Sequence, residues 1–110
     1  MTYEEISEML ESIGLPYTYY QWAENSAPAL PYIVFYYPGS NNFIADNKAY
    51  CKIAKLNVEF YSEEKDFDTE ASIEAVFEQN DLVYTKTEQY IESDQMYEVL
   101  YQMEVNINES

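Results

Sequence analysis

Carboxylates are the most abundant side chains in this sequence that could bind a metal ion or move a proton. Asp66, Asp68 and Glu70 alternate along the chain as the first ligands of a calcium-binding loop do. An EF-hand also needs glycine at its sixth position and glutamate at its twelfth, where this chain has Ala71 and Phe77. The same acids would favour the positive end of a helix dipole. We therefore interpret them as helix-capping residues and predict no metal site.

The residues that other common active sites require are scarce or missing. The sequence has no histidine, one cysteine and only two glycines, so it lacks a nucleophile with a base and a phosphate-binding loop. Cys51 lies in a strand-like run, which is typical of a small buried hydrophobic residue. A hydrolase with two carboxylates is compatible with the residue types, but nothing singles out a pair. We predict that the protein is not an enzyme and binds no cofactor.

The net charge is strongly negative. The chain has 21 acidic residues against 5 basic ones, which gives −16 at pH 7, and every basic residue is a lysine. Binding to nucleic acid or to an anionic membrane depends on Lys and Arg that face phosphates, so we expect neither. The sequence opens without a basic and apolar leader, and no apolar run could span a bilayer, so we expect a cytosolic protein.

The length and composition predict one folded domain, residues 1–110. Apolar residues make up 47% of the chain, enough for a core despite the charge. Thirteen tyrosines are the other excess. They can cover the faces of a sheet or contact a partner subunit, and the sequence leaves both interpretations open.

The first third of the chain predicts a helix and two aromatic strands. Thr2 and Glu5 form a capping-box pattern, and Gly14 would end the helix. Apolar residues recur between them at helical spacing, at Ile6, Met9, Leu10 and Ile13. Residues 17–22 and 32–37 are typical of strands, with a polar, proline-bearing connection between them.

A polar segment between two strands is the strongest functional signal. It spans Pro38 to Ala49, which is too long for a tight hairpin turn, so we expect a loop. Two of its residues, Phe43 and Ile44, are apolar and could enter a partner's pocket, unless Phe43 folds back onto its own sheet. The predicted partner-binding loop comprises Pro38, Gly39, Ser40, Asn41, Asn42, Phe43, Ile44 and Asp46.

The remaining chain predicts a long strand, a second helix and two more strands. In residues 50–61 one face carries Ala54, Leu56, Val58 and Phe60. Cys51 and Ile53 have the opposite parity, so either both faces are covered there or a bulge shifts the register. The second helix follows Asp66, ends near Asn80, and has an apolar face of Ile73, Val76 and Phe77.

The fold class follows from the order of these elements. Residues 82–91 and 96–107 are the last two strands, and the second alternates between apolar and polar residues. The order is α-β-β-β-α-β-β. We predict an α+β fold with two helices packed on one face of a mainly antiparallel or mixed sheet.

Three segments resemble a known protein family. They are PYIVFYYPGSNNFIAD (31–46), KIAKLNVEFYSEEKD (52–66) and YEVLYQMEVNINE (97–109). The chain is similar over nearly its full length to small prophage-encoded proteins from the tail-module genes of long-tailed phages of Gram-positive bacteria. These proteins are labelled minor tail components and identified as tail terminators. The shared motifs are structural ones.

The resemblance implies a homo-oligomer, a hexameric ring that caps the completed tail tube and offers a surface for joining the head. The implied partners are the tail-tube protein and a head-completion or connector protein, with DNA only passing through the lumen. The family's tube-contacting loops correspond here to the segment from Pro38 to Ala49, and no catalytic residue comes with the family. The implied location is the bacterial host cytoplasm during assembly and then the virion tail. Candidate residues for contact with the acids of a neighbouring subunit are Lys48, Lys52 and Lys55.

The alternative function is that of an acidic DNA mimic that inhibits a host restriction or CRISPR nuclease. A mimic should carry its carboxylates along one face at phosphate-like spacing. Here they are spread over both predicted helices, the turn at 59–70 and the last strand. This distribution favours the assembly protein.

Overall fold

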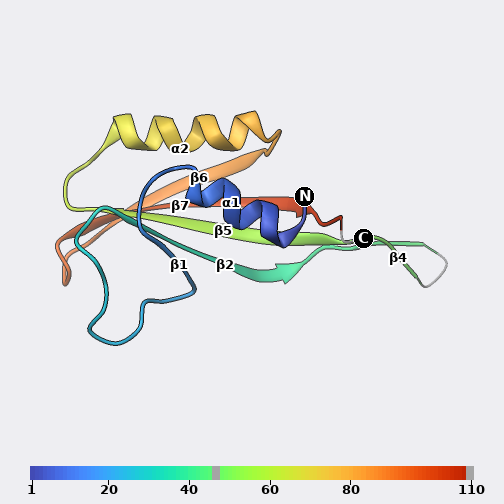
Figure 1. Cartoon of the computed structure of the whole chain (residues 1–110), viewed down its shortest axis with the longest axis horizontal. Helices are drawn as coiled ribbons and strands as arrows, with labels where there is room; N and C mark the ends of the chain where they lie inside the picture. The colour runs from blue at the N-terminus through green and yellow to red at the C-terminus, as the bar shows by residue number, and fades with distance from the viewer. Residues whose placement is uncertain (46–47, 109–110) are drawn as a thin grey trace.

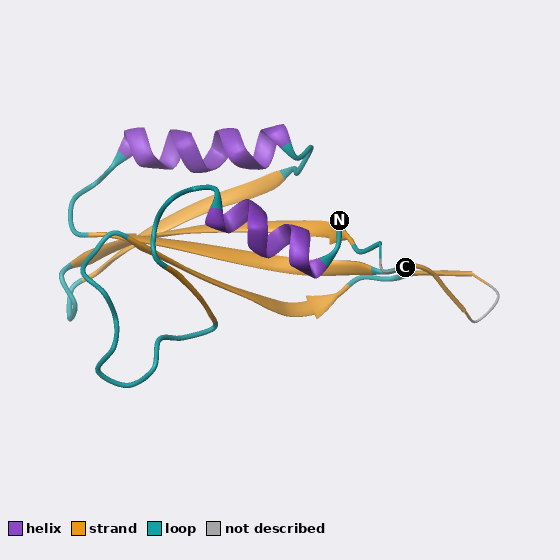
Figure 2. Ribbon diagram, viewed as in Figure 1, coloured by secondary structure: helices purple, strands orange, loops and turns teal. Residues whose placement is uncertain are grey.

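Two helices cover one face of a five-stranded sheet in the computed structural model, which describes residues 1–45 and 48–108 (Figures 1 and 2). The elements in chain order are α1 (Tyr3–Glu11), β1 (Tyr17–Tyr19), β2 (Tyr32–Ser40), β3 (Phe43–Ala45), β4 (Lys48–Cys51), β5 (Ile53–Ser62), α2 (Phe67–Gln79), β6 (Tyr84–Ile91) and β7 (Met96–Asn106). The main sheet has the order β1-β2-β5-β7-β6. The β1–β2 pair is parallel and the other pairs are antiparallel. The predicted α+β class is confirmed, with a mixed sheet.

Helix α1 forms where the capping pattern places it. The Thr2 hydroxyl accepts a hydrogen bond from the Glu5 amide at 3.0 Å, and the Glu5 carboxylate accepts one from the Thr2 amide at 2.8 Å. Both amides would otherwise lack partners at the start of the helix. After α1 the backbone reaches φ +88° at Gly14, a conformation that favours glycine. These two features fix the position of the helix in the chain.

The core lies between the helices and the inner face of β5 and β7. The predicted alternation of β5 is confirmed, because Ala54, Leu56, Val58 and Phe60 are all buried. They pair across the sheet with Val105, Met103, Tyr101 and Val99, which are also buried. The apolar stripes of both helices join the same cluster, as predicted. Phe77 of α2 packs edge-on against the Tyr101 ring, with 5.3 Å between the ring centroids.

The segment from Pro38 to Ala49 differs from the predicted loop. Strand β2 continues through Ser40, and the chain then forms a two-stranded hairpin of β3 and β4. The long strand predicted for residues 50–61 is interrupted at Lys52, where β4 ends and β5 begins. The reason is a change of pairing partners: the Lys52 carbonyl accepts a hydrogen bond from the Ile107 amide, and the Ile53 carbonyl accepts one from the Asn41 amide. The hairpin register also shifts between Phe43 and Ile44, but this bulge precedes Cys51 and does not account for the parity change. The pairing of β5 with β7 is unbroken from Ile53 onward, and Ile53 is half-buried on the face opposite Ala54, so both faces of the sheet are partly covered at this end.

Candidate protein-binding site

The β3–β4 hairpin projects from one end of the main sheet, along the longest dimension of a molecule measuring 50 × 30 × 23 Å (Figure 1). Ile44 is 67% exposed and Phe43 is 58% exposed. The other described members of the predicted site are exposed too: Pro38, Gly39, Ser40, Asn41 and Asn42. Asp46 lies outside the described residues. The predicted site is therefore divided: Pro38 to Ser40 end β2 within the main sheet, and Asn41 and Asn42 lead to the hairpin. Only Phe43 and Ile44 among its described residues lie on the projecting hairpin, with their apolar side chains in contact with solvent.

Two asparagines attach the base of this hairpin to the main sheet. The Asn42 side chain accepts a hydrogen bond from the Ile53 amide at 3.0 Å, and the Asn41 side chain donates one to the Glu104 carboxylate at 3.0 Å. Pro38 lies where the β2–β5 register shifts, a position at which its missing N–H does least damage to the ladder. The hairpin thus leaves the sheet in a direction set by contacts with β5 and β7.

Two of the three predicted subunit-contact lysines lie beside this base with exposed side chains. Lys52 separates β4 from β5, and Lys55 faces away from the helices, opposite Glu104 on β7. The ion pairs among the described residues all involve Lys65 or Lys86, so neither Lys52 nor Lys55 forms one within that part of the chain. Lys48 begins β4, and its side chain is not among those described.

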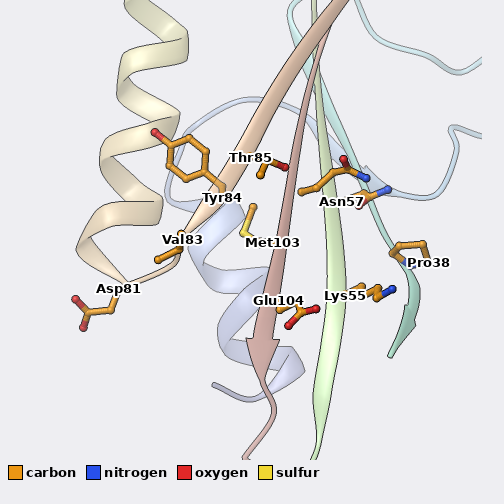
Figure 3. Close-up of a pocket in the computed structure, with 10 residues that line it drawn as sticks. Pro38, Lys55, Asn57, Asp81, Val83, Tyr84, Thr85, Met103 and Glu104 are labelled. Carbon is orange, nitrogen blue, oxygen red and sulfur yellow. The ribbon is translucent and has the colours of Figure 1, made fainter. Parts of the chain in front are cut away.

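A groove of about 570 Å³ lies near the same end of the sheet (Figure 3). Its lining mixes apolar groups such as Val83, Tyr84 and Met103 with the charged groups Lys55 and Glu104. The labelled side chains in Figure 3 come from the neighbouring strands β2, β5, β7 and β6 and from the turn before β6. This lining offers contact area and single polar groups, and none of its side chains forms a nucleophile with a base. The groove suits binding better than chemistry.

The open face of the sheet also carries a pair of carboxyl groups that sequence reasoning missed. Glu98 is buried, and its two oxygens accept hydrogen bonds from the Tyr61 hydroxyl at 2.7 Å and from the Gln89 amide at 2.8 Å. Glu59 forms a hydrogen bond with the same carboxyl group. Burial and the adjacent Glu98 raise the pKa of Glu59 to about 7. Burial acts to raise the pKa of Glu98, but hydrogen bonds from Glu59, Tyr61 and Gln89 outweigh it and lower that pKa.

These two glutamates share one proton near neutral pH, with Glu59 as its carrier. The sequence did contain one signal for this pair. The alternation of β5 and β7 places Glu59 and Glu98 on the same face of the sheet, opposite the buried apolar residues of both strands. The pairing itself depends on the register between two strands that are far apart in the sequence. A paired carboxylate site for hydrolysis needs a substrate cleft around it, and neither glutamate lines the groove described above.

The alternating acids near α2 have structural partners. Asp66 is the N-cap of α2, and its carboxylate accepts hydrogen bonds from the Thr69 amide and hydroxyl at 3.0 and 2.6 Å. Glu70 is only 1% exposed and lies between Lys65 and Lys86 at 2.6 and 2.9 Å, so it joins α2 to β6. Among the described residues no group of three or more potential ligands could hold a metal ion. The capping interpretation describes Asp66 correctly, whereas the ion pairs of Glu70 were not foreseen.

Some tyrosines are buried in the core and others are exposed. Tyr101 is fully buried in the core, and Tyr84 packs against it with 5.4 Å between the ring centroids. Four others are exposed by 45% or more: Tyr3, Tyr19, Tyr20 and Tyr90. Three of these four contact aromatic rings of β2: Tyr3 and Tyr19 both pack against Tyr37, with 5.1 and 5.8 Å between the ring centroids, and Tyr20 packs against Tyr36 at 5.5 Å. Tyr90 lies apart from them on β6, the opposite edge of the sheet.

Comparison with known proteins provides no family for this chain. No protein-family model matches it, and no curated protein does. None of the helices in the described part of the chain is long and apolar enough to cross a membrane. Any functional conclusion therefore has to come from the hairpin, the charged ends of the sheet and the sequence resemblance.

Proposed function

We propose that this protein is a structural virion subunit of the tail-terminator type, which forms a ring, caps the tail tube and joins the tail to the head. The observation that carries the proposal is the projecting hairpin, which presents Phe43 and Ile44 to solvent beyond the end of the sheet. Strand β3 of the hairpin lies in one of the segments that resemble the tail-terminator family, and the hairpin overlaps the stretch from Pro38 to Ala49 that corresponds to its tube-contacting loops. Its proposed partner is the tail-tube protein or the adjoining ring at the head.

The energetics of the hairpin support a docking role. A side chain such as Ile44 contributes on the order of 1.5–3 kcal/mol when it is fully transferred from water to an apolar site. On the hairpin most of that contribution is not realised, because Ile44 remains 67% exposed. A complementary pocket on a partner would realise it, and a docked apolar anchor surrounded by polar residues is the usual form of an interface hot spot.

The charge of the chain supports a lumen-forming role. A channel that attracted phosphates would hold the DNA that passes through a tail, whereas an anionic wall repels it. A net charge of −16 per subunit provides such a wall, provided that the acids do not all lie at subunit contacts.

The DNA-mimic alternative gains no support from the positions of the acids. Exposed carboxylates occur on α1 at Glu4, on the β5–α2 turn at Glu63, on α2 at Glu78 and on the β6–β7 turn at Glu92. The two turns lie together at one end of the sheet, but Glu4 and Glu78 lie on two separate helices, so these carboxylates do not follow one strip at phosphate-like spacing.

The hairpin can be tested with the double variant Phe43→Ser and Ile44→Ser, added to assembled tubes of the tail-tube protein from the same tail module. We expect the variant to keep its thermal midpoint and to lose co-sedimentation with the tubes, with a Kd at least about tenfold higher. The matched control is Phe67→Ser, because Phe67 is 71% exposed but lies at the start of α2, at the other end of the sheet from the hairpin. A double variant that caps tubes as well as the wild-type protein, or that unfolds, would contradict the docking role.

A further inference from the structure

Positive charge is concentrated at the hairpin end of this acidic molecule. Residues 38–55 contain three lysines and one aspartate, a net charge of +2, so the other 92 residues carry −18. One of those other acids, Glu104 of β7, also lies at this end, opposite Lys55. Lys52 and Lys55 are exposed at this end and have no ion-pair partner within the described residues. The ten residues of β5 separate this end from the other end of the sheet by about 30 Å, at roughly 3.3 Å per residue.

The opposite end of the sheet is acidic. The turn between β5 and α2 and the turn between β6 and β7 lie together there, because Ser62 pairs with Tyr97 and Ile91 with Met96. These two turns carry five carboxylates: Glu63, Glu64, Asp66, Glu92 and Asp94. The one lysine in the same turns, Lys65, is already bound to the carboxylates of Glu70 and Glu88, both at 2.6 Å. The acidic end therefore lacks a basic partner of its own.

A cavity of about 390 Å³ opens at this acidic end, lined by Leu30, Pro31, Ser62, Glu63, Glu64, Lys65 and Asp66. Ser62 is only 4% exposed, and its hydroxyl has no hydrogen-bond partner among the described residues. A buried hydroxyl in this state is uncommon and costs stability until it gains a partner. The carboxylate of Asp66 already caps α2, and the ammonium group of Lys65 is held by Glu70 and Glu88. The exposed carboxylates of Glu63 and Glu64 and the unsatisfied hydroxyl remain as a site for a second ammonium group, which brings one positive charge and three donors.

We infer that this acidic cavity receives the lysine-bearing base of the hairpin of a second copy of the chain, with Lys52 or Lys55 as the entering group, so that the contact does not use Phe43 and Ile44. The two surfaces have opposite charge, and they lie at opposite ends of one molecule, so each must find its partner on another copy. Different patches on the two copies make the contact heterologous, which closes into a ring when the rotation between the copies allows it. This inference rests on the proposed ring and identifies how its subunits join.

Charge-reversal variants test the contact by native mass measurement of the purified chain at fixed concentration. One variant carries Lys52→Glu and Lys55→Glu, a second carries Glu63→Lys and Glu64→Lys, and a third carries all four substitutions. We expect each double variant to raise the Kd for self-association at least about tenfold, and the fourfold variant to recover most of that loss. Recovery in the fourfold variant shows that the two ends meet. Each double variant leaves like charges facing each other across the contact, whereas reversing both sides restores opposite charges there.

The control substitutes Glu8→Lys and Glu11→Lys on α1, two exposed acids with the same total charge change as the second variant. It should leave the oligomer unchanged, so a loss as large as that of the second variant would mean that net charge alone is responsible. A fourfold variant that stays monomeric, or a wild-type chain that is itself monomeric, overturns the head-to-tail contact. Failure of the proposed function would appear differently, as a head-to-tail oligomer that does not bind tail tubes.

Discussion

Replacing Glu59 by glutamine should change how the stability of the protein depends on pH. In the wild-type protein Glu59 and Glu98 share a proton on the open face of the sheet, and raising the pH removes it and leaves two adjacent charges. Glutamine has nearly the same shape as protonated glutamic acid and can donate a hydrogen bond to Glu98 in its place. It cannot ionise, so the variant keeps the low-pH arrangement at every pH.

The sign of the effect follows from the two pKa values of Glu59. Its pKa is about 7 in the folded protein, against an ordinary value of 4.5. The folded state therefore binds more protons than the unfolded state between these values, and the wild-type protein loses stability as pH rises from about 4.5 to about 7. At full strength this pKa difference corresponds to about 3 kcal/mol. Glu59 is half-buried, and solvent screening reduces the figure to about 1 kcal/mol.

Urea denaturation of both proteins near pH 5 and near pH 8.5 measures this effect. We expect the two free energies of unfolding to agree closely near pH 5, and Glu59→Gln to be more stable by about 1 kcal/mol near pH 8.5. Glu8→Gln removes the same charge from an exposed site on α1 and should show no comparable change between the two pH values. A Glu59→Gln protein that is equally destabilised at both pH values would show that the shared proton does not exist.

Two further predictions concern the core and the charge. Leu10→Ala and Phe77→Ala each remove a fully buried side chain from the interface between helix and sheet, and each should lower the free energy of unfolding by roughly 2–5 kcal/mol; an unchanged thermal midpoint in either variant would refute the packing. The protein should bind no duplex DNA at physiological salt, because it has no arginine and a net charge of −16. Salt-sensitive retardation of DNA in a gel at micromolar protein would overturn that expectation.

Local patterns in the sequence were sufficient to predict most of the fold. The capping box at Thr2 and Glu5 is a short-range signal, and the structure contains both of its hydrogen bonds. The alternation in β7 was equally readable, because its inner face is buried along nearly its whole length. Such signals depend only on residues a few positions apart, and burial against a single core reinforces them.

The features that sequence reasoning missed depend on long-range pairing. The hairpin appeared as a loop because its strands are short and polar residues dominate the segment, so β propensity was weak there. The contact of Glu59 with Glu98 needs the β5–β7 register, and the burial of Glu70 needs α2 to lie over Lys86 of β6. In both contacts the two partners are too far apart in the sequence for a local pattern of residues to include them together.

The position of Lys86 has a consequence for how the molecule behaves at high concentration. β6 forms one edge of the main sheet, and an exposed edge of this length can recruit strands from other chains into aggregates. Lys86 extends from that edge toward α2, where Glu70 and Glu74 bind its ammonium group at 2.9 and 2.8 Å, while a third of its side chain stays in contact with solvent. A strand that added to β6 and flattened it would pull this lysine away from a carboxylate that is almost completely buried. The ion pairs of Lys86 with α2 therefore disfavour the addition of further strands at the β6 edge. They do not involve the two ends of the sheet, where the proposed contacts between subunits lie.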